Sequence, residues 1–197
     1  HGDVRERPWN VRRNDASTFH ADLDTRDFAD FNYPFAMRFL LELTLEGDEL
    51  TARVIAENLE ERIVPVGLGF HPYFRRALGK RDEDACLTLP AERVYPSVGC
   101  IPTGPAQPVE GRTDLRGGEP LAGRELDDCF TDLTGPIRLD YPSSGISLRM
   151  QPDPGFDHAV VYTSPEGGFV AVEPVSQVTD GFNLAARTWR RTGVTFL

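Results

Sequence analysis

The chain has 197 residues, of which 40% are hydrophobic and 26% are charged, so it can bury the core of one large domain. These proportions are those of a globular protein, and they exclude collagen-like, coiled-coil and wholly disordered chains. The 31 acidic and 21 basic residues give a net charge of -10, which would repel a nucleic-acid backbone or an anionic membrane. We therefore expect a small neutral molecule as the partner, with no nucleic acid and no membrane.

The hydrophobic pattern first becomes regular after Met37, where it predicts a β-hairpin. Hydrophobic residues alternate with mostly polar ones over residues 39–45 and again over 50–56, and Glu46-Gly47-Asp48 separates the two runs. Because successive side chains of a strand point to opposite faces, this pattern gives the hairpin one buried face.

Two more hairpins are predicted further along the chain. Residues 137–141 and 146–150 alternate on either side of a Pro-Ser-Ser-Gly turn, and residues 158–164 and 168–176 form two strands joined by a Pro-Glu-Gly turn. Pro174 is expected to mark the end of pairing in the last strand. The Pro- and Gly-rich residues 94–123 are expected to form a long surface loop. With no sustained helical period, the chain is predicted to be one all-β domain, a sandwich or a barrel.

The cysteines, the histidines and the longest apolar runs give no sign of a metal site or a membrane span. Cys86, Cys100 and Cys129 are an odd number without C-x-x-C spacing, which argues against a disulfide framework and a zinc ribbon. The four histidines lack the spacings of local metal motifs, so no metal is expected. No segment approaches the roughly 18 apolar residues of a transmembrane helix. We expect a reducing, cytoplasmic location.

His71 lies in the run GLGFHPYF, between flexible glycines and a proline that fixes the backbone. This setting would hold an imidazole on rigid, closely approached backbone at the rim of a sheet. The alternative is a histidine packed inertly among Phe70, Tyr73 and Phe74.

Glu173 lies in an apolar strand, FVAVEPVS, where the period of two places it on the face of Phe169 and Ala171. If it is partly buried, loss of solvation raises its pKa toward neutrality, as a general base requires. The alternative is a charged residue that protects the end of an edge strand.

Asp127 and Asp128 enter the apolar segment LDDCF, and adjacent residues of a strand face opposite ways. Only one of the two can therefore face a given pocket. The alternative for such a pair is turn or cap chemistry.

Four segments carry a family resemblance: GFHPYF, LDDCF, VVYTSPEGGFVAVEPVSQVTDGFNLA and the opening HGDVRERPW. Through them the chain resembles the aldose 1-epimerase (galactose mutarotase) family, nearest to its bacterial epimerase-like members. The resemblance spans essentially the whole chain. It implies a large antiparallel β-sandwich, the family's supersandwich, with an open sugar-binding cleft on one sheet.

The resemblance also implies roles for individual residues. His71 matches the acid that protonates the ring oxygen, and Glu173 matches the base that takes the proton of the anomeric hydroxyl. His1, Tyr73 and Asp127 match residues that contact the sugar. No cofactor is expected, because the exchange of α and β anomers needs only a proton donor and a proton acceptor.

Two departures from the family pattern affect the ends of the chain. Family members have strands and an Asn-Arg pair before the HG motif, and a further stretch with a final strand after TGVTFL. We therefore expect a fragment of a longer protein: one domain over residues 1–197 that lacks its first strands and its last strand.

Three other functions remain open at this point. A hexose-6-phosphate 1-epimerase would need a cationic site, for which Arg75 and Arg76 are candidates. A carbohydrate-binding module would keep the cleft without turnover. A glycoside hydrolase would use Asp127 and Glu173 as its carboxyl pair.

Overall fold

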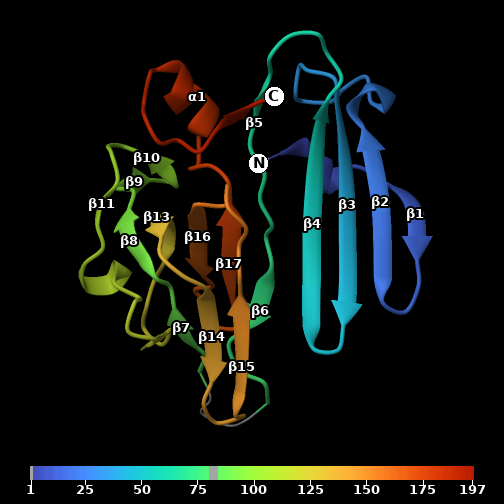
Figure 1. Cartoon of the computed structure of the whole chain (residues 1–197). Coiled ribbons are helices and arrows are strands. Elements are labelled where there is room, and N and C mark those ends of the chain that lie inside the picture. Colours follow the sequence, from blue (N-terminus) through green and yellow to red (C-terminus); the bar gives the residue numbers. More distant parts are fainter. Residues whose placement is uncertain (1, 80–83) are drawn as a thin grey trace. The chain divides into compact units, whose positions relative to one another are not determined.

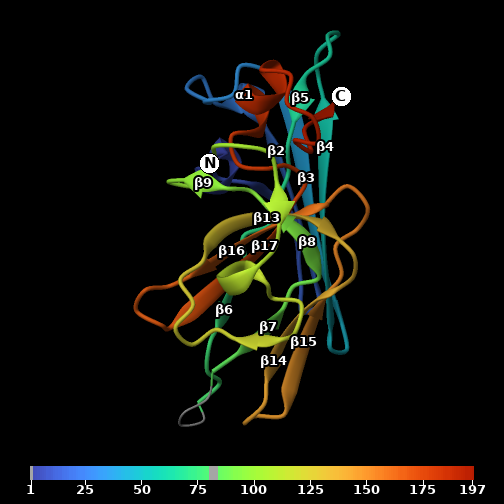
Figure 2. The same ribbon diagram turned by 90° about the vertical axis from the view of Figure 1, so that its left-hand side faces the viewer.

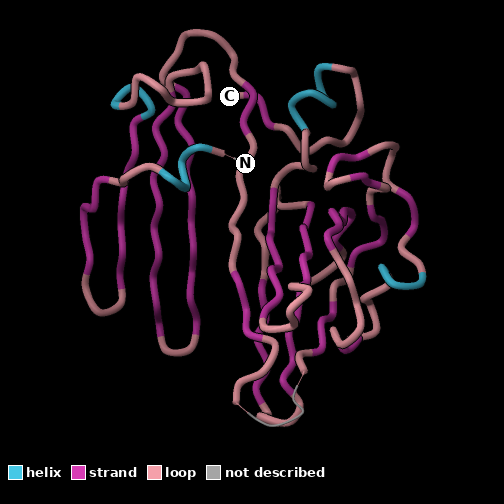
Figure 3. The backbone as a smooth tube through the Cα atoms, turned by 180° about the vertical axis from the view of Figure 1, so that it is seen from behind, coloured by secondary structure: helices cyan, strands magenta, loops and turns pink. Residues whose placement is uncertain are grey.

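The computed structural model describes residues 2–79 and 84–197, which divide into two compact units. The first comprises His1–Val66 and Thr195–Leu197, and the second comprises Gly67–Val194. Strands dominate both units, and helix is confined to a few short segments (Figure 3). The all-β fold class is confirmed, whereas the single domain over residues 1–197 stays a prediction. No helix within the described ranges is long and apolar enough to cross a membrane.

Four antiparallel strands in the order β1-β2-β3-β4 make the main sheet of the first unit (Figure 1). They are β1 (Asn10–Asn14), β2 (Thr18–Asp24), β3 (Met37–Glu46) and β4 (Glu49–Asn58). Two short 3-10 helices, η1 (Asp3–Glu6) and η2 (Thr25–Asp27), and the small pair β5 (Pro65–Val66) with β18 (Thr195–Phe196) complete the unit. The hairpin predicted after Met37 is confirmed as β3 and β4, and Gly47 has a φ of 63° at its two-residue turn.

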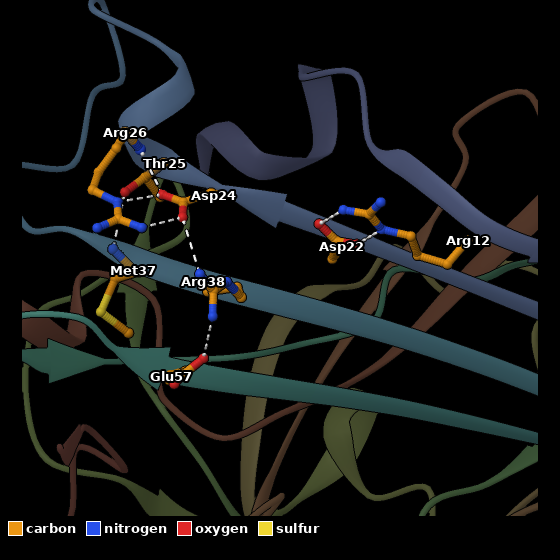
Figure 4. A network of polar contacts seen from close by, with 8 residues as sticks. All are labelled: Arg12, Asp22, Asp24, Thr25, Arg26, Met37, Arg38 and Glu57. Carbon is orange, nitrogen blue, oxygen red and sulfur yellow. Dashed lines mark hydrogen bonds and ion pairs between the residues drawn. The ribbon is translucent and has the colours of Figure 1, made fainter.

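Ion pairs tie three of these strands together across their polar surface (Figure 4). Asp24, at the end of β2, accepts from the guanidinium groups of Arg26 and Arg38, and Arg38 also reaches Glu57 on β4. The bond from Arg26 is the main cause that lowers the pKa of Asp24 to about 2. Such exposed pairs each contribute at most about 1 kcal/mol, so they order the strand ends more than they stabilise the fold.

Two antiparallel sheets build the second unit. One has the order β11-β8-β13-β16-β17-β6, the other has the order β12-β7-β14-β15, and β10 pairs with β9. The inner strands β13, β16 and β17 run side by side in both ribbon views (Figure 1 and Figure 2). The strands are β6 (Tyr73–Arg75), β7 (Cys86–Thr88), β8 (Ala91–Val94), β9 (Ser97–Val98), β10 (Ile101–Pro102), β11 (Gln107–Pro108), β12 (Glu119–Pro120), β13 (Asp127–Leu133), β14 (Ile137–Tyr141), β15 (Ile146–Met150), β16 (His158–Thr163) and β17 (Phe169–Val175). A 3-10 helix, η3 (Gly111–Thr113), and one short helix, α1 (Gly181–Ala186), complete the unit.

The core of the second unit lies between its two sheets. Phe130 and Val172 come from the six-stranded sheet, Leu87 and Leu139 come from the four-stranded sheet, and all four belong to one buried cluster. Burying an aliphatic or aromatic side chain of this size contributes about 1.5–3 kcal/mol, so the cluster is the main source of stability in this unit. The predicted β-sandwich is confirmed.

The two later hairpins are confirmed as β14–β15 and β16–β17. Pro174 was expected to end the pairing of the last strand, and this was wrong, because β17 continues to Val175 opposite His158. The carbonyl of Pro174 accepts from Phe70 N. Because the N–H and C=O of a strand residue point to the same side, the N–H that proline lacks would also have pointed toward Phe70 and away from β16. The ladder with β16 is therefore intact.

The Pro- and Gly-rich residues 94–123 are only partly the surface loop that the sequence predicts. The segment carries β9 to β12, none longer than two residues. Val109, Leu115 and Leu121 from the same segment are buried in the core cluster. Strands this short have no detectable period, so sequence patterning cannot reveal them.

Candidate functional site

His71 and Glu173 lie opposite each other across two neighbouring chain segments. Tyr73 pairs with Ala171 in the β6–β17 ladder, and Gly69 forms an isolated bridge with Val175. His71 lies midway between Gly69 and Tyr73, and Glu173 lies midway between Ala171 and Val175, so the two residues are opposite each other. The register therefore brings together two residues that are about a hundred positions apart in the sequence.

The pairing type places the two side chains at the closest approach that a sheet offers. Backbone hydrogen bonds run from Phe70 N to Pro174 O and from Val172 N to Pro72 O, so the position between them is a non-hydrogen-bonded pair. Side chains of such pairs on one face lie nearer than those of hydrogen-bonded pairs. Nε2 of His71 lies 3.2 Å from Oε1 of Glu173.

Glu173 is a mostly buried carboxyl group on an interior strand. β17 lies between β16 and β6, and the side chain of Glu173 is 13% exposed. Burial, together with the negative charge of Asp127, raises its pKa to about 7. The strand position excludes the alternative of a charged edge residue. Because both protonation states are populated near neutral pH, the group can accept and return a proton.

An aromatic surface adjoins the pair. Tyr73 is 58% exposed, and its ring centroid lies 4.7 Å from that of His71 and 5.1 Å from that of Phe169. Tyr162 lies next to Phe169, with a centroid separation of 6.4 Å. His71 is thus half-exposed beside an aromatic surface and opposite a carboxyl group, and it is not enclosed among Phe70, Tyr73 and Phe74. Exposed aromatic rings of this kind can cover the apolar side of a ligand ring.

Asp127 faces the same side of the sheet as Glu173. The pairs Asp127↔Tyr162 and Tyr162↔Ala171 place Asp127 in the same row across the sheet as Tyr73, one row from Glu173. Oδ2 of Asp127 accepts from Sγ of Cys100 at 2.9 Å. Asp127 opens β13, so it is a strand residue and not part of a turn.

Asp128 points to the opposite face and has a structural partner. Its carboxylate is buried and accepts two bonds from Arg112, at 2.5 and 2.8 Å. Arg112 also lines a hollow of about 720 Å³, together with Gly111, Gly123, Arg124 and Glu125. The lining contains none of the predicted site residues. The alternation of β13 therefore separates the two aspartates, and only Asp127 joins the site.

Of the remaining candidates, the structure places Arg75, Arg76 and His158. His1 is outside the described residues. Arg76 makes two bonds of 2.7 Å with Asp84, while Arg75 is exposed at the end of β6, where it pairs with Phe169 on the face of Tyr73. His158 is buried beside Tyr95. Within residues 2–79 and 84–197, no three His, Cys, Asp or Glu side chains are grouped so as to hold a metal ion.

Two further residues lie at this site. Phe169 could have been found from the sequence, because the period of two places it on the face of Glu173. Cys100 had no such signal. It reaches Asp127 from the β9–β10 hairpin, and its position depends on how that hairpin folds back.

The family model described as Aldose 1-epimerase matches residues 1–190. The chain belongs to the aldose 1-epimerase family. No curated protein gives a significant match by sequence. The family resemblance inferred from GFHPYF, LDDCF and the later motifs is thereby confirmed.

Solved structures share the fold of this aldose 1-epimerase family member at low sequence identity. A galactose mutarotase-like protein from Clostridium acetobutylicum has a TM-score of 0.84 and 17% identity, with 100% of this chain and 64% of that chain covered. A second galactose mutarotase-like protein, from Lactobacillus casei ATCC 334, has a TM-score of 0.77 and 20% identity, with 100% and 70% covered.

A protein from Synechocystis sp. PCC 6803 has a TM-score of 0.75 and 22% identity, with 98% of this chain and 62% of that chain covered. The chain thus spans less than two thirds of the length of the Clostridium and Synechocystis proteins. At these identities the likeness shows the fold.

Proposed function

We propose that this aldose 1-epimerase family member is a mutarotase that interconverts the α and β anomers of a hexose. The observation that supports this most directly is the His71–Glu173 pair: an imidazole 3.2 Å from a mostly buried carboxyl group. Membership of the family supports the same reaction class.

The reaction needs two proton transfers at neighbouring atoms. To open the ring, a base takes the proton of the anomeric hydroxyl while an acid protonates the ring oxygen, and both oxygens are bonded to the same carbon. Glu173 is the proposed base and His71 the proposed acid. After the aldehyde end rotates, the same groups exchange roles and the ring closes on its other face. Each group contributes about 10²–10⁴ to the rate in such reactions.

The raised pKa of Glu173 suits this cycle. At a pKa of about 7 the carboxylate is basic enough to take a hydroxyl proton and acidic enough to return it on closure. A fully solvated glutamate, with a pKa near 4.3, would be a much weaker base.

Sugar binding is assigned to the neighbouring side chains. Asp127 accepts hydrogen bonds from sugar hydroxyls, and the rings of Tyr73 and Phe169 cover an apolar side of the sugar ring. His1 remains proposed as a further contact.

The alternatives differ from this proposal in what they require. For a phosphorylated hexose, the cation would have to be the exposed Arg75, because Arg76 is held by two bonds with Asp84. A non-catalytic binding module needs neither a proton donor nor an acceptor, so it gives no account of a buried carboxyl group paired with an imidazole.

Polarimetry tests the proposal. Freshly dissolved α-glucose or α-galactose should approach its equilibrium rotation faster with the protein than in buffer alone. Equilibration at the buffer rate would reject the mutarotase assignment. The same assay with hexose 6-phosphates separates the alternatives, since a phosphate-dependent enzyme should leave the free sugar unchanged and accelerate the phosphate.

A further inference from the structure

The thiol of Cys100 is held against the proposed sugar-binding carboxylate. Its Sγ donates to Oδ2 of Asp127 at 2.9 Å, and it is the only side-chain donor to that carboxylate within the part of the chain that the structure describes. Asp127 is exposed, so without this bond its carboxylate would be free to turn into solvent. The Cys100 thiol therefore limits where the charge of Asp127 can lie.

The backbone at Cys100 is in a conformation that cysteine rarely adopts. Gly99 and Cys100 form the two-residue turn between β9 and β10, with φ values of 56° and 65°. Hairpin turns with two positive φ angles favour glycine or asparagine, and a side chain in this region costs about 1–2 kcal/mol. A cysteine here thus needs some other explanation, which the bond to Asp127 provides.

We propose that Cys100 is a positioning residue: β13 places Asp127 on the Glu173 face, and the S–H bond fixes the direction of its side chain, so that the carboxylate stays turned toward Glu173 and within reach of the sugar. The bond is expected to have two effects: it keeps the pKa of Glu173 raised, and it strengthens the binding of the sugar. Only the effect on sugar binding rests on the proposed function, whereas the effect on Glu173 can be measured without any activity.

The charges around Glu173 determine in which direction its pKa should change. Four titratable groups from the neighbouring elements influence Glu173 or lie beside it: His71 at 3.2 Å, Asp127, Cys100 and the buried Cys129. The hydrogen bond to Asp127 raises the pKa of Cys100 to about 11, so the thiol remains a protonated donor at neutral pH. The negative charge of Asp127 contributes to the raised pKa of Glu173. If Asp127 turned away, that contribution would weaken.

Cys100→Gly is the best deletion of the thiol. Glycine favours the positive φ at this position, so the variant should fold. Its thermal unfolding temperature should equal or exceed that of the original chain. Cys100→Ser is the matched control, because its hydroxyl can donate to Asp127 in the same place. Asp127→Asn and the double variant Cys100→Gly/Asp127→Asn complete a cycle.

Two readouts are followed in these four variants. The titration midpoint of Glu173, from the side-chain carboxyl signal in ¹³C NMR, should fall by about half a pH unit or more in Cys100→Gly and in Asp127→Asn. KM for the hexose, from initial rates in polarimetry, should rise about 3- to 10-fold in Cys100→Gly with kcat changed less, as for the loss of one hydrogen bond to a charged group. Cys100→Ser should retain the original values. The double variant should match Asp127→Asn alone.

Three results would overturn the proposal. They are an unchanged Glu173 midpoint in Cys100→Gly, equal defects in Cys100→Ser and Cys100→Gly, and additive effects in the double variant. If the original protein showed no mutarotation, the proposed function would fail, while the NMR cycle would still decide whether Cys100 acts on Glu173 through Asp127.

Discussion

One face of the six-stranded sheet carries Phe130, Val161 and Val172, none of them more than 1% exposed, whereas the other face carries Glu173 and the half-exposed His71. β17 supplies Val172 to one face and Glu173 to the other, and His71 comes from the segment just before β6. The first face packs into the core of the second unit, and the second presents titratable and aromatic side chains. Alternation within a strand is enough to give adjacent residues opposite environments.

Two pairs of sequence neighbours have the most different environments. Val172 is buried in the core, while Glu173 faces His71. Asp128 is buried and bonded to Arg112, while Asp127 is exposed and bonded to Cys100. Each pair thus separates a residue whose loss should lower stability from one whose loss should lower activity.

The largest effect is expected at His71. His71→Asn removes the proposed acid from an exposed position, so the rate of anomer exchange at saturating sugar should fall by about 10²–10⁴ while thermal stability changes little. Polarimetry and thermal unfolding measure the two quantities. Exchange at the original rate would contradict the role given to His71.

On the opposite face, Phe130→Ala should act on stability. The fully buried ring leaves a cavity, and the free energy of unfolding should fall by about 3–5 kcal/mol in denaturant titrations. The fraction that remains folded should exchange anomers at nearly the original rate. A well-folded variant without activity would break the proposed division between the faces.

Stability should depend on pH through Glu173. A carboxyl group whose pKa is about 7 when folded and about 4.5 when unfolded binds its proton more tightly in the folded state. Its contribution to stability is therefore present at pH 4 and is lost as the pH rises from about 4.5 to 7.

The Glu173→Gln variant has no carboxyl group at this position, so it should not lose stability as the pH rises from about 4.5 to 7. The variant should exceed the original protein in unfolding free energy by about 2–3 kcal/mol at pH 8, and by much less at pH 4. Denaturant titrations at the two pH values measure the difference. An equal effect of the substitution at both pH values would show that the carboxyl group has an ordinary pKa.

The smallest effect is expected at the aspartate pair. Asp128→Asn weakens the two bonds with Arg112, and because Arg112 is 57% exposed, the unfolding free energy should fall by only about 1–2 kcal/mol. Asp127→Asn should change it by less than about 0.5 kcal/mol and should instead raise KM. A loss of stability in Asp127→Asn together with a raised KM in Asp128→Asn would contradict the faces assigned to the two residues.

Patterning in the sequence predicts those strands that are long and have one buried face. Residues 137–141 and 146–150 alternate cleanly, and β14 and β15 have these bounds. The two-residue strands of 94–123 have no period, so the core residues Leu115 and Leu121 of that segment were not predicted.

At the site, the sequence identifies residue types and the fold supplies their neighbours. The alternation of FVAVEPVS correctly places Glu173 on one face, and its burial follows from the interior position of β17. That His71 lies opposite Glu173 depends on a register between distant segments, which no local pattern encodes. The contact of Cys100 with Asp127 depends in addition on a loop that folds back over the sheet.

Two-dimensional exchange NMR on an α/β hexose mixture measures anomer exchange at equilibrium, and with it the proton transfers assigned to His71 and Glu173. The original protein and the opposite-face control Val172→Ala should both give exchange peaks between the two anomeric protons, and Glu173→Gln should lower the exchange rate by about 10²–10⁴. Exchange by Glu173→Gln at the original rate would contradict the claim that the His71–Glu173 pair carries the proton transfers.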